Sequence, residues 1–97
     1  SKLPTLADPG EPMRVLIPSA LHSYTGRPRV EAAGGSLAAV LDDLERQFPG
    51  IRFRMIDEHA RIRRHIRFFI AGEAIHDLAA PLPADGELCI VQALSGG

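Results

Sequence analysis

Two glycines, Gly96 and Gly97, end the sequence and carry its most specific chemical signal. A C-terminal carboxylate has a reference pKa of about 3.5, so it is ionised at neutral pH. Such a carboxylate can attack the α-phosphate of ATP, and the acyl-adenylate that forms is open to attack by sulfur or nitrogen. Glycine has no Cβ atom, so a glycine tail passes a narrow channel easily. We therefore expect Gly97 to be the reactive position and Gly96 to provide access to it, although frayed chain ends are also common.

The other side chains with catalytic potential form no recognisable catalytic motif. Adjacent helical positions point about 100° apart, so Asp42 and Asp43 are expected on a solvated face. Cys89 lies in an expected strand without a histidine near it in sequence, which favours a small packing residue over a nucleophile. No phosphate loop or metal-ligand spacing occurs, so we expect neither an enzyme nor a metal site. The scattered histidines, each expected to be solvated or hydrogen-bonded, are His22, His59, His65 and His76.

A basic segment, RIRRHIR at 61–67, places four arginines among seven residues. It could contact phosphates, but it has no interleaved aromatic residues and lies in a chain of net charge −1. The pattern favours a solvated strand entry or a patch that meets an acidic protein partner. Binding to nucleic acid is not expected.

Length and composition indicate one small domain of 97 residues, 45% apolar and 24% charged. No apolar run approaches the roughly 18–20 residues that cross a bilayer, so no membrane partner is expected. A single cysteine excludes an internal disulfide and any all-cysteine metal site. These features predict a reduced, cytoplasmic domain without a bound cofactor.

The first half of the sequence predicts a hairpin. Residues 13–18, MRVLIP, alternate between apolar and other positions, as a strand with one buried face does. Turn residues follow at 22–28, where Gly26 can adopt a positive φ. The segment 27–33 is expected to be the second strand, and Pro28 indicates an edge position or a strand start.

The clearest helix lies in the segment GGSLAAVLDDLERQFPG at 34–50, between the pair Gly34-Gly35 and the pair Pro49-Gly50. Ser36 is a good N-cap, and Pro49 and Gly50 end the helix. One apolar stripe at helical spacing is expected to cover a sheet, and it comprises Leu37, Val40, Leu41, Leu44 and Phe48.

In the second half, the segment at 51–64 has a mixed pattern in which Ile51, Met55 and Ile56 could anchor a short second helix. A strand over 66–70 follows, with a turn at 71–73. An irregular segment precedes a last strand over 87–94. In the earlier strand Ile66, Phe68 and Ile70 are expected to face the core, so Phe69 faces away from it. In the last strand Leu88 and Ile90 face opposite to Cys89 and Val91.

This order of elements predicts an α+β fold of the β-grasp, or ubiquitin-like, type. It has a mixed sheet of four to five strands, with one main helix packed on one face after a right-handed crossover. We expect a flexible N-terminal tail at 1–12, the β-grasp domain at 13–94 and a flexible reactive tail at 95–97. From Ala93 to Gly97 that tail could reach roughly 16–18 Å when extended.

The uncovered face of the sheet is the expected docking surface for a partner. Phe69, Cys89 and Val91 share that face and would form a small apolar patch, which Leu94 and Ser95 continue toward the tail. The alternative is that a loop covers these residues and that they complete the packing. The residues by themselves leave both interpretations open.

The sequence resembles the MoaD/ThiS/CysO-type ubiquitin-like sulfur carriers, which include the small subunit of molybdopterin synthase, the thiamine-pathway carrier and the cysteine-pathway carrier. The resemblance runs from Met13 to Gly97, through MRVLIPSAL, the helix segment, MIDEHARIRRHIRFFIAGEAI and PLPADGELCIVQALSGG. Its most specific parts are DGELCIVQALSGG and IRFFIAGEAI. The long segment from Pro49 to Arg64 is more similar to the cysteine-pathway branch. The family often has asparagine near the positions of Arg67 and Ala71, where this sequence departs from it.

The resemblance implies a cycle in which an E1-like enzyme adenylates Gly97 with MgATP. A sulfur donor would convert the adenylate to a thiocarboxylate, and a downstream sulfur-accepting synthase would take the sulfur for cysteine, cofactor or thio-metabolite biosynthesis. The chain would then be a protein cosubstrate. Two alternatives remain open: a ubiquitin-like modifier that forms isopeptide bonds, and a non-covalent β-grasp interaction module.

Overall fold

Five strands form one mixed sheet within the part of the chain that the structure, a computed structural model, describes: residues 12–83 and 86–93. Residues 1–11 of the tail expected at 1–12, and the residues Leu94, Ser95, Gly96 and Gly97, lie outside it. The elements are β1 (Pro12–Leu16), a 3-10 turn η1 (Ser19–Leu21), α1 (His22–Thr25), β2 (Arg29–Ala33), α2 (Leu37–Gln47), α3 (Ile51–Met55), β3 (Ile66–Ile70), β4 (Glu73–Ile75) and β5 (Glu87–Gln92).

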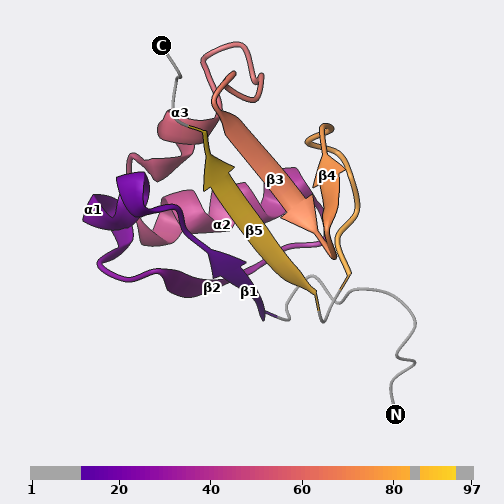
Figure 1. Cartoon of the computed structure of the whole chain (residues 1–97), viewed down its shortest axis with the longest axis horizontal. Helices are drawn as coiled ribbons and strands as arrows, with labels where there is room; N and C mark the ends of the chain where they lie inside the picture. Colours follow the sequence, from indigo (N-terminus) through magenta and orange to yellow (C-terminus); the bar gives the residue numbers. More distant parts are fainter. Residues whose placement is uncertain (1–11, 84–85, 94–97) are drawn as a thin grey trace.

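The strands lie in the order β2-β1-β5-β3-β4. The central pair, β1 and β5, is parallel, and the pairs β1–β2, β3–β5 and β3–β4 are antiparallel. Helices α2 and α3 lie behind this sheet in Figure 1, so they cover one of its faces. The predicted β-grasp arrangement, a mixed sheet with one main helix on one face, is confirmed.

The first hairpin follows the apolar alternation, because Met13, Val15 and Ile17 are all buried. Strand β1 begins at Pro12, one residue before the expected start, and β2 forms the edge of the sheet as Pro28 indicated. The connection between the strands is more ordered than the simple turn that was expected. It contains η1 and α1, buries Leu21, and ends at Gly26 with φ +75°.

Helix α2 begins where Ser36 was expected to cap it, since the Ser36 hydroxyl accepts a hydrogen bond from the Ala39 N–H at 3.2 Å. Two further N–H groups of the first turn, those of Leu37 and Ala38, donate to carbonyls of the segment that precedes β5. The helix is thus fixed by its own cap and by a distant loop. Gly50 follows the end of the helix with φ +97°, a backbone conformation that residues other than glycine adopt only with strain.

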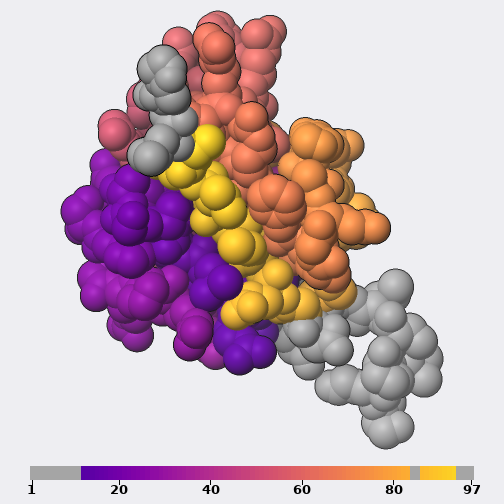
Figure 2. All heavy atoms as spheres, viewed as in Figure 1, coloured from indigo at the N-terminus to yellow at the C-terminus, as the bar shows by residue number. Residues whose placement is uncertain are grey.

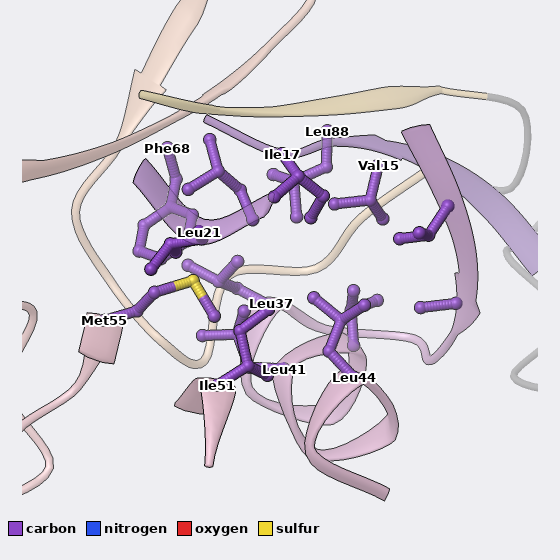
Figure 3. Close-up of a cluster of buried hydrophobic side chains, with 14 of the residues drawn as sticks. Val15, Ile17, Leu21, Leu37, Leu41, Leu44, Ile51, Met55, Phe68 and Leu88 are labelled. Carbon is purple, nitrogen blue, oxygen red and sulfur yellow. The ribbon is translucent and has the colours of Figure 1, made fainter. Parts of the chain in front are cut away.

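The core lies between the sheet and the two main helices. Figure 3 shows side chains from the sheet, including Val15, Phe68 and Leu88, pointing toward side chains of α2 and α3. Each fully buried side chain of this size stabilises the fold by about 1.5–3 kcal/mol. The predicted stripe of α2 is confirmed, with Leu37, Val40, Leu41 and Leu44 buried and Phe48 half-buried.

Gly34 is a position at which the chain backbone passes too close to α2 for any side chain. A Cβ atom built there would lie 2.6 Å from the Val40 nitrogen and 2.7 Å from the Ala39 carbonyl carbon. At the neighbouring Gly35, a Cβ atom would meet nothing within 4 Å. The close approach of the β2–α2 link to the helix therefore requires glycine at position 34.

Two side chains of α2 hydrogen-bond the backbone of the edge strand β2. The Ala33 N–H donates to Asp43 Oδ2 at 2.9 Å, and Gln47 Nε2 donates to the Glu31 carbonyl at 2.9 Å. The expectation that Asp43 would lie on a solvated face was wrong, because its side chain is 17% exposed, against 69% for Asp42. Edge strands expose backbone groups that invite pairing with other chains. By bonding the Ala33 N–H and the Glu31 carbonyl, Asp43 and Gln47 make these two backbone groups of the edge unavailable to another chain.

The chain from α3 to β4 makes two tight turns. Asp57 accepts the N–H groups of His59 and Arg61, at 2.8 and 3.0 Å, and thereby closes the loop before β3. The β3–β4 hairpin turns at Ala71 and Gly72, both with positive φ, as expected for a turn at 71–73. Positive φ at both central residues is the type I′ geometry that favours Asn-Gly, so Ala71 is strained there.

Candidate functional site

Strand β5 is the central element of the candidate site, because it leads directly to the glycine tail. It is paired with β1 on one edge and with β3 on the other. Its last residue, Gln92, lies opposite Ile66, and the Ala93 N–H donates to the His65 carbonyl at 2.8 Å. The backbone is therefore held in place up to Ala93, four residues before Gly97.

The face of the sheet opposite to the helices carries a row of apolar side chains. Cys89 lies directly across from Phe69 on β3 and from Leu16 on β1. Figure 2 views this face, with the yellow atoms of β5 between β1 and β3. Leu16, Cys89 and Phe69 are half-buried, and Val91, farther along β5, is 37% exposed. We call Leu16, Phe69, Cys89 and Val91 the open-face row.

A shallow depression of about 570 Å³ lies over part of this row. Leu16, Phe69 and Cys89 line it, and Pro83 and Gly86 border it at the start of β5. Val91 lies at the other end, nearer to the tail. Both interpretations of the patch, a docking surface or packing under a loop, remain predictions.

Charged side chains flank the open-face row at both ends. Arg14 of β1 lies across from Glu31 and from Glu87, and its Nε atom is 4.0 Å from the Glu87 carboxylate. Toward the tail, Arg67 of β3 lies across from Val91. An apolar centre with a charged rim is the composition that many protein interfaces have.

The structure brings together three of the predicted partner-binding residues. Phe69, Cys89 and Val91 share one face, and their binding role remains a prediction. Leu94 and Ser95, like Gly96 and Gly97, lie outside the described residues. Leu16 was missed, although the alternation that turns Met13, Val15 and Ile17 inward also places Leu16 on the opposite face.

The carboxyl groups with shifted pKa values serve the fold and lie away from the open-face row. The pKa of Asp43 is lowered mainly by the hydrogen bond from the Ala33 N–H, and Arg46 and Gln47 add to it. The N–H groups of Gly50 and Arg52 lower the pKa of Glu45, which joins α2 to α3. The N–H of Arg61 is the main cause that lowers the pKa of Asp57.

Within residues 12–83 and 86–93, no group of three or more His, Cys, Asp or Glu side chains is placed to hold a metal ion. The histidines stay apart, and the His22 ring bonds the Ile17 carbonyl at 2.9 Å. In the same part of the chain, no helix is long and apolar enough to cross a membrane.

No family model matches the chain. It is 30% identical to the sulfur carrier protein CysO of Mycobacterium tuberculosis over 89 residues, which cover 86% of this chain and 96% of the relative. The CysO protein of Mycobacterium bovis matches equally well.

Solved structures give the same result. The crystal structure of the BexX/CysO complex from Amycolatopsis orientalis contains a chain with a TM-score of 0.80 and 30% identity, covering 88% of this chain and 99% of that one. Mycobacterium tuberculosis CysO has a TM-score of 0.79 at 28% identity, covering 84% and 99%. Small archaeal modifier protein 1 from Haloferax volcanii, at 24% identity and a TM-score of 0.76 with 89% and 99% covered, shares the fold. The chain therefore belongs to the family of CysO-like sulfur carriers, which are ubiquitin-like proteins.

Proposed function

We propose that this chain carries sulfur as a thiocarboxylate on Gly97. The observation that supports the proposal best is the placement of β5, which is held on both edges and bonded through Ala93 to His65. A central strand fixed in this way presents whatever follows it from a rigid base. Gly97 is four residues beyond Ala93, and Gly96 precedes it without a side chain.

The proposed chemistry takes place in three transfers. An E1-like enzyme binds MgATP and positions its α-phosphate for attack by the Gly97 carboxylate, and pyrophosphate leaves. A sulfide-level nucleophile from a sulfur donor then attacks the acyl carbon, and AMP leaves. The thiocarboxylate sulfur then displaces a leaving group from an acceptor bound to a sulfur-accepting synthase, in cysteine, cofactor or thio-metabolite biosynthesis. Hydrolysis of the acyl–sulfur bond leaves the sulfur on the acceptor and restores the Gly97 carboxylate.

In this cycle the chain is a substrate of other enzymes and not an enzyme itself. The BexX/CysO complex is a family member bound to another protein. We propose that this chain docks onto its partners through the open-face row, with Phe69, Cys89 and Val91 buried in the contact. ATP and reduced sulfur are both supplied in the cytoplasm, where a free thiol such as that of Cys89 also persists.

Intact-mass measurement tests the proposal. The protein is incubated with MgATP, a sulfide source and a candidate activating enzyme from the same genome. The expected product gains the mass difference between one sulfur and one oxygen at its C-terminal fragment. A variant lacking Gly97 should gain nothing while keeping the stability of the full chain.

Other outcomes would point elsewhere. Heavier conjugates with lysine side chains in cell extracts would assign the chain to the modifiers. If the chain formed stable complexes but gained no mass with any activating enzyme of the genome, it would be assigned as a non-covalent interaction module.

A further inference from the structure

Among the described residues only three of the ten arginines form a salt bridge, and three of the others, Arg63, Arg64 and Arg67, lie together at the start of β3. Arg14, Arg46 and Arg52 each lie within 4.0 Å of a carboxylate. Within the described residues, no carboxylate oxygen lies within that distance of Arg63, Arg64 or Arg67. Three neighbouring positive charges of this nearly neutral protein can therefore bind another molecule without breaking a salt bridge.

Two of these side chains are held in position by the protein's own backbone. Arg63 Nε donates to the Phe53 carbonyl at 2.7 Å, and its guanidinium lies 4.5 Å from the centre of the Phe53 ring. Arg67 donates to the carbonyls of Arg64 and Ile66. A guanidinium has five N–H donors, so each side chain keeps donors for another molecule. Holding the side chains in place lowers the entropy cost of binding.

The three arginines line one groove of about 540 Å³ with apolar residues between them. Ile62 and Ile75, both half-buried, are among these apolar residues. We call this the basic groove. Its composition, positive charges around aliphatic carbon, is complementary to a protein segment with carboxylates on either side of an apolar side chain.

The basic groove lies one strand away from β5, since the loop before β3, β3 itself and β4 line it. Its residues extend from the loop before β3 onto β3, and β3 is paired with β5 so that Ile66 lies opposite Gln92. His65, between Arg64 and Ile66, accepts the bond from Ala93. Figure 1 shows the loop before β3 beside the arrowhead of β5. A protein that contacts the end of β5 therefore lies within one strand of the groove.

We propose that the basic groove binds an acidic segment of the enzyme that receives the tail. The identity of that enzyme rests on the proposed function, whereas the preference of the groove for an acidic peptide rests on its own residues. The groove is distinct from the open-face row and adds electrostatic steering to apolar docking. Charge complementarity of this kind mainly raises the association rate and selects the partner.

The substitution Arg64→Glu tests the groove, because Arg64 is exposed and the reversal inverts one charge at its rim. Arg27→Glu is the matched control, an equally exposed arginine in the loop before β2, outside the groove. Arg64→Lys keeps the charge. Thermal unfolding verifies that all variants remain folded.

Binding is measured first without any enzyme. The ¹⁵N-labelled protein is titrated with a synthetic peptide of glutamates around one leucine, and separately with an oligothymidylate of the same charge. We expect amide shifts confined to the basic groove with the peptide, about fivefold weaker binding for Arg64→Glu, and no change for Arg27→Glu. Absence of localised shifts at millimolar peptide would refute the proposal, and tighter binding of the oligothymidylate would assign the groove to nucleic acid.

Adenylation kinetics then test the link to the carrier function. Arg64→Glu should lower kcat/KM by about tenfold at low salt with kcat retained, and the loss should shrink as salt rises. Arg64→Lys and Arg27→Glu should stay within about twofold of the unsubstituted protein. A thiocarboxylate made equally fast by Arg64→Glu would reject the groove and keep the carrier function. Peptide binding without any thiocarboxylate would keep the groove and reject the carrier function.

Discussion

Cys89 and Phe69 are direct cross-strand partners on β5 and β3, on the face of the sheet that the helices leave uncovered. Directly opposed side chains in an antiparallel pair lie about 4.5–5.5 Å apart at Cβ, so the two form one continuous surface. Leu16 extends it on the other side of Cys89. This relationship brings residues from three strands together beside the element that leads to the tail.

Phe69→Asp should reduce adenylation by at least about tenfold while the protein stays folded. Phe69 is half-buried on the uncovered face, so the new carboxylate reaches water and costs little stability, but it places a charge in the apolar centre of the docking surface. Phe69→Leu is the matched control and should keep most of the activity. Adenylation rates and circular dichroism give the two readouts. Equal rates for both folded variants would place the docking surface elsewhere.

Asp43→Asn should lower the free energy of unfolding at neutral pH by about 1 kcal/mol. The folded-state pKa of Asp43 is below its ordinary value of 3.8, so the ionised carboxylate stabilises the fold above that value. This stabilisation is lost as pH falls through the folded-state pKa. The difference between the variant and the unsubstituted protein should therefore close on acidification.

Urea unfolding between about pH 6 and pH 3 measures this difference. Asp42→Asn is the control, because Asp42 is 69% exposed and bonds no backbone group of β2. Its loss of stability at neutral pH should be smaller than that of Asp43→Asn. If the difference in unfolding free energy between Asp43→Asn and the unsubstituted protein stayed constant across this pH range, the lowered pKa of Asp43 would be contradicted.

Gly34→Ala should destabilise the protein by about 1–3 kcal/mol, because the added methyl group meets the backbone of α2. Gly35→Ala, one residue later, meets nothing within 4 Å and should change stability by less than about 0.5 kcal/mol. Chemical denaturation of the two variants gives the comparison. Similar losses in both would show that the close approach at Gly34 is relieved by a backbone shift.

Ala71→Asn should stabilise the protein by about 0.5–1 kcal/mol, because asparagine tolerates positive φ better than alanine does. Ala71 has φ +52° and precedes Gly72 at φ +84° in the β3–β4 turn. Ala71→Val should have the opposite effect, since a branched Cβ is strained at positive φ. The melting temperatures of the unsubstituted protein and of the two variants measure these changes in stability. A less stable asparagine variant would mean that strain at this turn does not limit stability.

The predictions from sequence succeeded where a signal lies within a few residues. The alternation of Met13, Val15 and Ile17, the apolar stripe of α2 and the cap at Ser36 each depend on local geometry. The short helix α3 was predicted for the same reason, and Ile51 and Met55 are buried in it. Such periodicities follow from 3.6 residues per helical turn and from two per strand repeat.

The prediction for Asp43 failed because its partner is distant in sequence. Nothing near Asp43 shows that the Ala33 N–H, ten residues earlier, lies within hydrogen-bond reach. The contact of Gly34 with α2 likewise depends on how the helix packs against β2, and no local pattern indicates it. Both contacts depend on the angle between two elements, which local propensity does not specify.

The sequence by itself determined the main helix, the strands of the β-grasp order and the expectation that Gly97 is the reactive position, because these depend on local periodicity and on residue identity. Only the tertiary structure decided that η1 and α1 fill the first connection, that Leu16 joins Cys89 and Phe69, and that Arg63, Arg64 and Arg67 line one groove along β3. The physical reason is strand register. A shift of one residue would turn every side chain of a strand to the other face, and register is set by packing between segments far apart in the chain.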